Sequence, residues 1–170
     1  CLKNRSATSL QISSGEVSMS IKMASPAFDT GAAIPKKHTE DGENISPTIK
    51  WTEIPARAKE LALICDDPDA PRPAPWVHWV IYKIPFNATR LPEGVGKVAS
   101  PPEVPGALQG KNSWDKLGYG GPAPPRGHGI HHYHFRGFAM DAPLNVSPGM
   151  TKEELLAAMK GHVLAQCELI

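Results

Sequence analysis

The segment WVHWVIYKIP, residues 76–85, decides the fold class that the sequence predicts. Most of its ten residues are aromatic or β-branched, and such residues favour the pleated, half-buried surface of a β-sheet. The run LALICDD, residues 61–67, is apolar until its last two residues, which is typical of a buried strand. That strand is expected to break at the prolines that follow. Two strands of this kind in succession predict a β-rich core.

Further strands are expected on both sides of this pair. EVSMSIKM, residues 16–23, alternates strictly, so every second residue is predicted to face the core: Val17, Met19, Ile21 and Met23. IKW, residues 49–51, and HHYHFRGFAMD, residues 131–141, also have strand patterns. Residues 86–127 are rich in Gly and Pro and show little periodicity, and a gap of that length usually holds a functional loop region.

The strongest helix pattern is TKEELLAAMK, residues 151–160. Thr151 and Glu154 have the spacing of a capping box, which predicts where the helix begins. Its apolar stripe is made by Leu155, Leu156 and Met159. Residues 161–170 fit either a continued helix or a strand.

Length and composition predict one ordered domain. The chain has 170 residues, enough for one core, and we expect a tail at 1–15 and a single domain at 16–170. The net charge of +1 argues against a nucleic-acid-binding protein, since such domains are usually strongly basic. No run approaches 18 apolar residues, so no transmembrane segment is expected.

The three cysteines, Cys1, Cys65 and Cys167, give no disulfide framework and no metal-binding pair. Cys65 ends an apolar run and is interpreted as a buried, inert thiol. A first residue that is Cys and not Met fits a trimmed sequence, or a mature bacterial lipoprotein with lipid on Cys1. The compartment therefore stays open between the cytoplasm and the cell envelope.

Residues 118–135, GYGGPAPPRGHGIHHYHF, hold four of the seven histidines. Because side chains alternate along a strand, His131 and Tyr133 are predicted to face one side. His132 and His134 then face the other side, and their role stays open. The four rings cannot form one cluster, and a metal would need ligands from elsewhere, so we assign no metal ligand.

A second group of polar residues lies in DDPDAPRPAPWVHW, residues 66–79. Carboxylates follow the end of a buried strand, and His78 comes on the next strand. A carboxylate beside an imidazole fixes its tautomer and favours its charged form, so Asp67 with His78 is one candidate wall of an anion site. The alternative is that Asp67 and Asp69 only accept hydrogen bonds from turn amides. No residue has the setting of an activated nucleophile.

Together these segments resemble the phosphatidylethanolamine-binding protein family, in the bacterial and archaeal branch often called Raf-kinase-inhibitor-like. The blocks, in the family's order, are DGENISP (41–47), DDPDAP (66–71) with WVHW (76–79), GYGGPAPPRG (118–127) and IHHYHF (130–135). The helix pattern closes the match. DPDAP followed by HW, then GPxPPxG and HxY, is a specific combination.

The resemblance implies a mainly β fold, with a large antiparallel sheet packed on a smaller sheet and a C-terminal helix. It also implies a small pocket at one edge that binds an anion such as phosphate or a phosphorylated headgroup, with no cofactor and no catalytic residue. Matching the family's motifs residue by residue gives the implied ligand-binding residues: Asp67, Asp69, Pro71, His78, Gly120, Pro124, Pro125, His131 and Tyr133.

The family's members include inhibitors of kinases and of serine-type peptidases, so the resemblance implies a binding protein with such a partner. A homodimer is among the expectations for the oligomeric state. Two alternatives follow from the residues themselves. One is a small hydrolase or isomerase that uses Asp67, His78 and His131 for acid–base chemistry. The other is a protein that binds metal through its histidine-rich strand.

Overall fold

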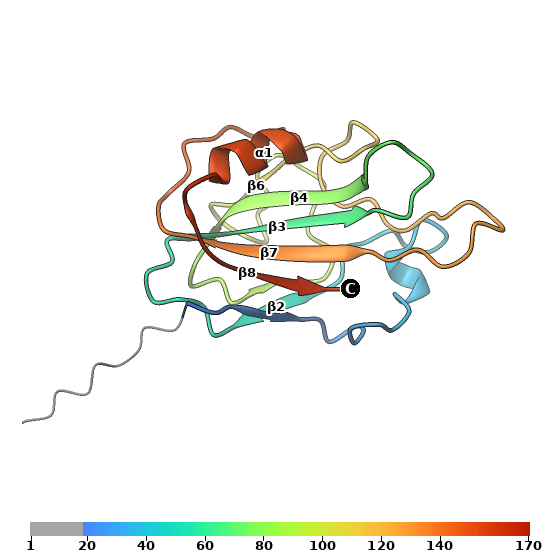
Figure 1. Cartoon of the computed structure of the whole chain (residues 1–170), viewed down its shortest axis with the longest axis horizontal. Coiled ribbons are helices and arrows are strands. Elements are labelled where there is room, and N and C mark those ends of the chain that lie inside the picture. The colour runs from blue at the N-terminus through green and yellow to red at the C-terminus, as the bar shows by residue number, and fades with distance from the viewer. Residues whose placement is uncertain (1–18) are drawn as a thin grey trace, which may run out of the picture.

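The fold, described for residues 19–170 by a computed structural model, consists of two antiparallel sheets (Figure 1). In order, the larger sheet contains β6 (Leu108–Gln109), β4 (Trp76–Pro85), β3 (Glu60–Asp67), β7 (His134–Met140) and β8 (Val163–Leu169). The smaller sheet contains β1 (Lys22–Ala24), β2 (Ile49–Thr52) and β5 (Arg90–Leu91). The helical elements are the 3-10 helix η1 (Lys36–His38) and the α-helix α1 (Lys152–Met159). This architecture confirms the expected mainly β fold with a large and a small sheet.

The larger sheet is buried on both faces at its centre. All eight residues of β3 are buried, which explains why its sequence is apolar without alternation. Leu61, Leu63 and Cys65 face the core between the two sheets, whereas Ala62 and Ile64 face a second cluster that α1 covers. Burying one such side chain contributes about 1.5–3 kcal/mol, so this sheet is the stable frame for the loops at its ends.

The C-terminal elements settle the ambiguous last ten residues. α1 begins with the expected capping box, in which Thr151 Oγ1 accepts from Glu154 N at 3.2 Å. The helix ends where Gly161 takes a φ of +83°, which favours glycine, and the chain then forms β8. Leu155 and Met159 are buried as predicted, but Leu156 is 37% exposed, because it lies beside the stripe that faces the sheet.

The N-terminal strand is shorter than predicted. β1 covers only Lys22–Ala24, with Ile21 buried just before it and Met23 half-buried. Met19 is 48% exposed, so the prediction that it faces the core is wrong: the chain reaches β2 only at Lys22, which pairs with Thr52. Val17 and the predicted tail at 1–15 lie outside the described residues.

Strand β7 begins three residues later than predicted, at His134. β3 pairs with β7 as far as Asp66 and His134, and beyond that point Asp67 pairs with Trp76 of β4. Residues 131–133 therefore lie just before β7 in the chain and outside its paired part. Tyr133 still packs against the core between the sheets, and His131 and Tyr133 both line the space at the end of β3.

Distant segments of the chain meet at this end of the larger sheet. Figure 1 shows η1, the connection between β3 and β4, and the loop before β7 together at the right of the view. Hydrogen bonds tie these segments: Glu40 N donates to Pro122 O at 3.0 Å, and Tyr119 Oη donates to His38 O at 2.7 Å. The loops thus form one supported rim.

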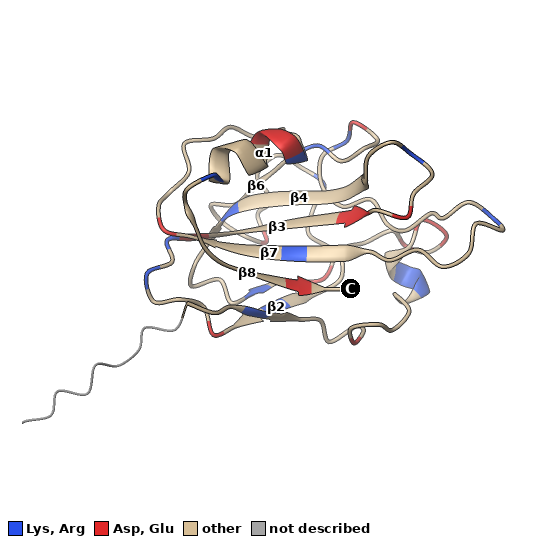
Figure 2. Cartoon of the chain, in the orientation of Figure 1, with Lys and Arg blue, Asp and Glu red and all other residues tan. Residues whose placement is uncertain are grey.

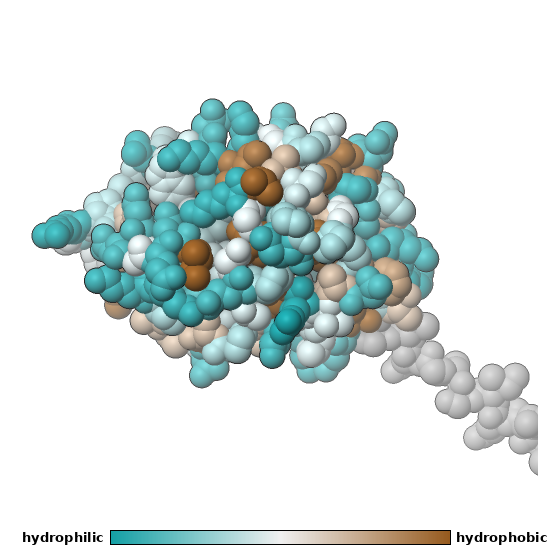
Figure 3. Space-filling model, turned by 180° about the vertical axis from the view of Figure 1, so that it is seen from behind, coloured by the Kyte–Doolittle hydropathy of each residue, from teal (hydrophilic) through white to brown (hydrophobic). Residues whose placement is uncertain are grey.

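The rest of the surface carries charges of both signs and small hydrophobic groups. Figure 2 shows charges of both signs spread over the molecule, with the acidic end of β3 beside the basic Arg136 of β7. On the rear face, Figure 3 shows small hydrophobic groups within a mostly hydrophilic surface. No helix among residues 19–170 is long and apolar enough to cross a membrane.

Candidate functional site

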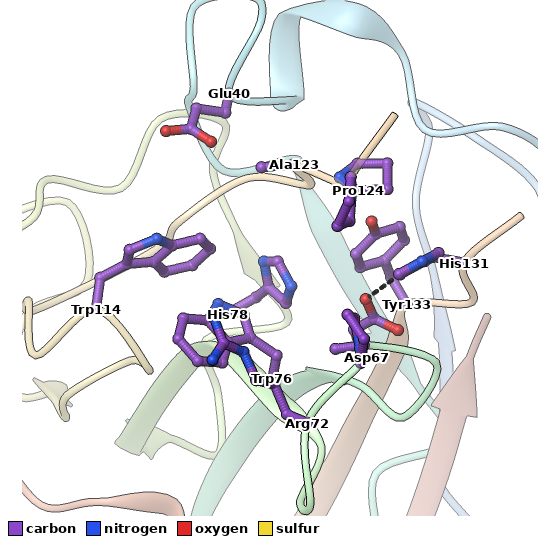
Figure 4. Close-up of a pocket in the computed structure, with 13 residues that line it drawn as sticks. Glu40, Asp67, Arg72, Trp76, His78, Trp114, Ala123, Pro124, His131 and Tyr133 are labelled. Carbon is purple, nitrogen blue, oxygen red and sulfur yellow. Dashed lines mark hydrogen bonds and ion pairs between the residues drawn. The ribbon is translucent and has the colours of Figure 1, made fainter. Parts of the chain in front are cut away.

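A cavity of about 230 Å³ lies at the end of β3, under the rim of loops (Figure 4). β3, β4 and the segment before β7 each deliver side chains to it. Seven of the nine residues implied by the family motifs line it: Asp67, Pro71, His78, Pro124, Pro125, His131 and Tyr133. The sheet thus brings together residues that are more than sixty positions apart in the sequence.

Asp67 is buried, at 3% exposure, and both of its oxygens are used. His131 Nδ1 donates to Oδ2 at 2.6 Å, and Asp69 N donates to Oδ1 at 2.8 Å. Asp67 therefore accepts a turn amide, as one interpretation had it, and also holds an imidazole, but that imidazole is His131 and not the predicted His78. The pairing leaves Nε2 of His131 as its second polar atom, and that atom lies 2.9 Å from Nδ1 of His128.

His78 has a different partner from the one the sequence suggested. Its Nδ1 donates to the carbonyl of Gly120 at 2.7 Å and not to Asp67, because Asp67 is already held by His131. Burial lowers the pKa of His78, while the hydrogen bond to Gly120 and the charge of Asp67 act in the opposite direction. In the neutral ring the proton is on Nδ1, since a carbonyl can only accept. The His78 ring is held edge-on between aromatic neighbours, 5.2 Å from Trp114 and 5.1 Å from Tyr133.

Tyr133 lines the cavity with a buried hydroxyl that has no hydrogen-bond partner in the described protein. Burial raises the pKa of Tyr133, and the charge of Asp67 adds to this, so the group stays a neutral donor. A buried hydroxyl without a partner costs about 1–3 kcal/mol. A ligand oxygen in the cavity would remove that cost.

The permanent charges around the cavity are one cation and two carboxylates. Arg72 is the permanent cation of the lining, with its guanidinium 5.2 Å from the centre of the Trp76 ring. Asp67 and Glu40 are the carboxylates, and Figure 4 shows Glu40 on the opposite rim from Arg72. A bound anion therefore needs positive charge beyond Arg72, which a protonated His78 or His131 would supply.

Sequence reasoning missed part of this lining. Arg72 and Trp76 belong to a quoted block, and their four-residue separation around prolines was a usable signal for stacking. Trp114, the one tryptophan in the Gly- and Pro-rich region 86–127, was another signal. Nothing in the sequence pointed to Glu40. The remaining unexpected lining residues are Ala70 and Ala123.

Two implied residues do not line the cavity. Gly120 lies against Trp114, where an added Cβ would be 2.6 Å from the ring, and it contributes its carbonyl to His78. Asp69 points to the surface, where its Oδ2 accepts from His132 N at 2.8 Å and from His132 Nδ1 at 2.7 Å. His134 pairs with Glu168 of β8. His132 and His134 thus face away from His131 and Tyr133, as the alternation predicted.

The structure offers little support for the enzyme and metal-binding alternatives. The lining of the cavity contains no Ser, Thr or Cys. Cys65 is 1% exposed, and burial raises its pKa, which fits the predicted inert thiol. Within residues 19–170, no group of three or more His, Cys, Asp and Glu side chains is arranged to hold a metal ion.

Comparisons with known proteins place this chain in a family. A family model described as phosphatidylethanolamine-binding protein matches residues 24–170. A UPF0098 protein of Methanothermobacter thermautotrophicus is 49% identical over 144 residues, which are 85% of this chain and 92% of the relative.

Solved structures agree with this assignment. CT736 of Chlamydia trachomatis, a homologue of the family, has a TM-score of 0.80 and 37% identity, covering 89% of this chain and 95% of its own. YbcL of E. coli, described as a member of the mammalian family, has a TM-score of 0.81 and 29% identity, covering 88% and 94%. Such membership supports a binding-type protein. The chain belongs to the phosphatidylethanolamine-binding protein (PEBP) family, in the branch that resembles YbcL.

Proposed function

We propose that this protein is a non-enzymatic binding protein whose cavity takes a small anion or the phosphorylated headgroup of a larger ligand. The observation that best supports the proposal is the hydroxyl of Tyr133, buried in the cavity wall without a partner. It lies in the same wall as His78, His131 and the guanidinium of Arg72. A phosphoryl group offers several acceptor oxygens, and each of these side chains can donate to one of them. His78 donates through Nε2 once that atom is protonated, and His131 donates through Nε2 once the ligand replaces His128 as its partner.

The strength of binding follows from these donors. A hydrogen bond to a charged group contributes about 1.5–3 kcal/mol. Ordering the ligand and removing water from the carboxylates offsets part of that sum. Free phosphate is therefore expected to bind with modest affinity, and a ligand with additional apolar contacts to Trp76 and Trp114 is expected to bind more tightly.

Catalysis is not part of the proposal, because the described lining offers acid–base groups without a Ser, Thr or Cys nucleophile beside them. Asp67 holds His131 and accepts the amide of Asp69, which is an orienting role. The proposed role also includes a protein partner of the kinase or serine-type peptidase class, as the family resemblance implies. Ligand occupancy of the cavity would regulate the binding of that partner.

A thermal-shift panel tests the proposal. Purified protein is heated with phosphate, phosphoethanolamine, acetate, zinc chloride or EDTA, as the wild type, His131→Ala and His132→Ala. His132 is the matched control: it is the neighbouring histidine, also carboxylate-paired, but 59% exposed outside the cavity. A ligand at a hundredfold excess over its Kd stabilises the folded state by about 2.7 kcal/mol.

The expected result is a rise in midpoint with both phosphate compounds for the wild type and His132→Ala, and no rise for His131→Ala. Equal shifts in all three proteins would refute the cavity as the binding site. A response to zinc or EDTA alone would favour the metal-binding alternative. Turnover of p-nitrophenyl phosphate that His78→Ala abolishes would favour the hydrolase.

A further inference from the structure

A second cavity, of about 210 Å³, adjoins the first and shares Glu40 and Trp114 with it. We call it the lysine cavity, because Lys97 and Lys116 line it. Gly120 also lines it, while its carbonyl accepts from His78 on the other side. Trp114 and the Gly120 backbone therefore form a common wall between the two cavities.

Five lysines of the described chain are ion-paired, and the two of this cavity are not among them. Lys22, Lys37, Lys83, Lys111 and Lys152 each have a carboxylate partner. Within the part of the chain that the structure describes, neither Lys97 nor Lys116 forms an ion pair. Burial lowers the pKa of Lys97, and the charge of Lys116 lowers it further. Two cations thus line one hollow, close enough for their charges to interact, with Glu40 as the one carboxylate in its described lining.

The loop that carries Lys116 is held in place by a buried amide. Asn112 Oδ1 accepts from Trp114 N at 3.0 Å and from Lys116 N at 3.2 Å, and its Nδ2 donates to Gly118 O at 3.0 Å. The backbone of Lys97 is packed against Gly118, where an added Cβ would lie 2.9 Å from Lys97 Cα. Both lysine backbones are therefore fixed, while both lysines are exposed to solvent at the cavity.

We propose that the lysine cavity binds a second anionic group, so that the ligand carries two anionic groups, one on each side of Trp114. This inference rests on the proposed function, which supplies the first group. By formal charge the lysine cavity is the more cationic of the two, with two lysines against one glutamate. The first cavity has one arginine against two carboxylates. The matching ligand class is a phosphate ester with a second phosphate or carboxylate.

Isothermal titration calorimetry with phosphonates of known length tests this inference. Alkane bisphosphonates with one to five methylene groups are compared with alkylphosphonates of the same length, at fixed ionic strength. The proteins are the wild type, the double variant Lys97→Met/Lys116→Met, and Lys111→Met. Lys111 is the matched control, because its backbone pairs with Leu117 of the lining, whereas its ammonium pairs with Asp115 at 2.7 Å and it does not line the cavity.

At one chain length, we expect the wild type to bind the bisphosphonate about tenfold or more tightly than the monophosphonate. The double variant is expected to lose that advantage and keep the wild-type Kd for the monophosphonate, whereas Lys111→Met keeps both. Equal affinities at every length, or an advantage that survives in the double variant, would overturn the inference and leave the proposed function standing. No monophosphonate binding by the wild type, or binding that His131→Ala leaves unchanged, would refute the proposed function and this inference with it.

Discussion

Two neighbouring carboxylates at the end of β3 have opposite surroundings. Asp66 and Asp67 are both buried, at 2% and 3% exposure, and point to opposite faces of the sheet. On the helix side, Asp66 pairs with two permanent cations, Arg136 of β7 and Lys152 of α1. On the cavity side, Asp67 pairs with His131, whose charge depends on protonation.

The difference teaches how one strand end serves both stability and binding. The negative charge of Asp66 is paired with cations of the protein itself. This carboxylate therefore links β3 to β7 and α1. Asp67 holds an imidazole at the wall of a cavity, where a ligand can interact with the same ring. The two side chains are alike in type and burial, so substituting each in turn separates the two roles.

The largest effect is expected for Asp66→Asn, which leaves Arg136 and Lys152 without their common carboxylate. Removing one partner of a buried ion pair costs about 3–5 kcal/mol, and the partial exposure of Arg136 places this case near 3 kcal/mol. Urea denaturation measures the loss. Phosphate affinity, corrected for the folded fraction, should equal that of the wild type, and a matching loss of affinity would show that the two faces are coupled.

Asp67→Asn is expected to affect binding more than stability. The asparagine Oδ1 can still accept from Asp69 N, but the charged hydrogen bond that orients His131 is lost. His131 is then no longer held in one orientation in the cavity wall, and we expect phosphate affinity to fall about tenfold because one donor to the ligand is misplaced. Calorimetric titration measures the affinity. If Asp67→Asn destabilises the protein as much as Asp66→Asn and binds phosphate normally, the comparison fails.

The smallest effect concerns a single titrating group, His78. Because burial lowers its pKa below the ordinary 6.5, the unfolded chain binds the proton more readily than the fold does. The free energy of unfolding should therefore decrease as the pH falls below about 6.5, and less so in His78→Gln. Denaturation curves between pH 7.5 and 5 measure this, and equal pH dependence in both proteins would contradict it.

An anion in the cavity should favour the protonated form of His78. Sulfate serves as the probe, because it does not itself titrate in this range. We expect wild-type sulfate affinity to rise as the pH falls, with a weaker dependence in His78→Gln.

The sheet was predictable from the sequence because its central strands carry their own signal. Residues 61–67 and 76–85 are buried on both faces, so their apolar character marks β3 and β4 almost to the residue. The family motifs then indicated most of the lining. The boundary of β7 was not predictable from its pattern, since HHYH continues a strand-like run although pairing stops at His134.

The partners within the site depended on tertiary paths that no local pattern records. β3 lies between β4 and β7, so either neighbour could have supplied the imidazole for Asp67. The loop before β7 supplies it, and His78 of β4 is held instead by a carbonyl 42 residues away. Glu40 and Trp114 reach the cavity on loops whose course is set by contacts such as Glu40 N to Pro122 O.

The most direct test of the central claim is calorimetric titration of Tyr133→Phe with phosphoethanolamine, beside its melting midpoint without ligand. The hydroxyl has no partner in the described protein, so its removal should leave the midpoint unchanged or raise it. The account predicts that affinity nevertheless falls about tenfold, because a ligand oxygen loses its donor. Wild-type affinity in Tyr133→Phe, with the fold intact, would contradict the claim that this cavity binds the phosphoryl group.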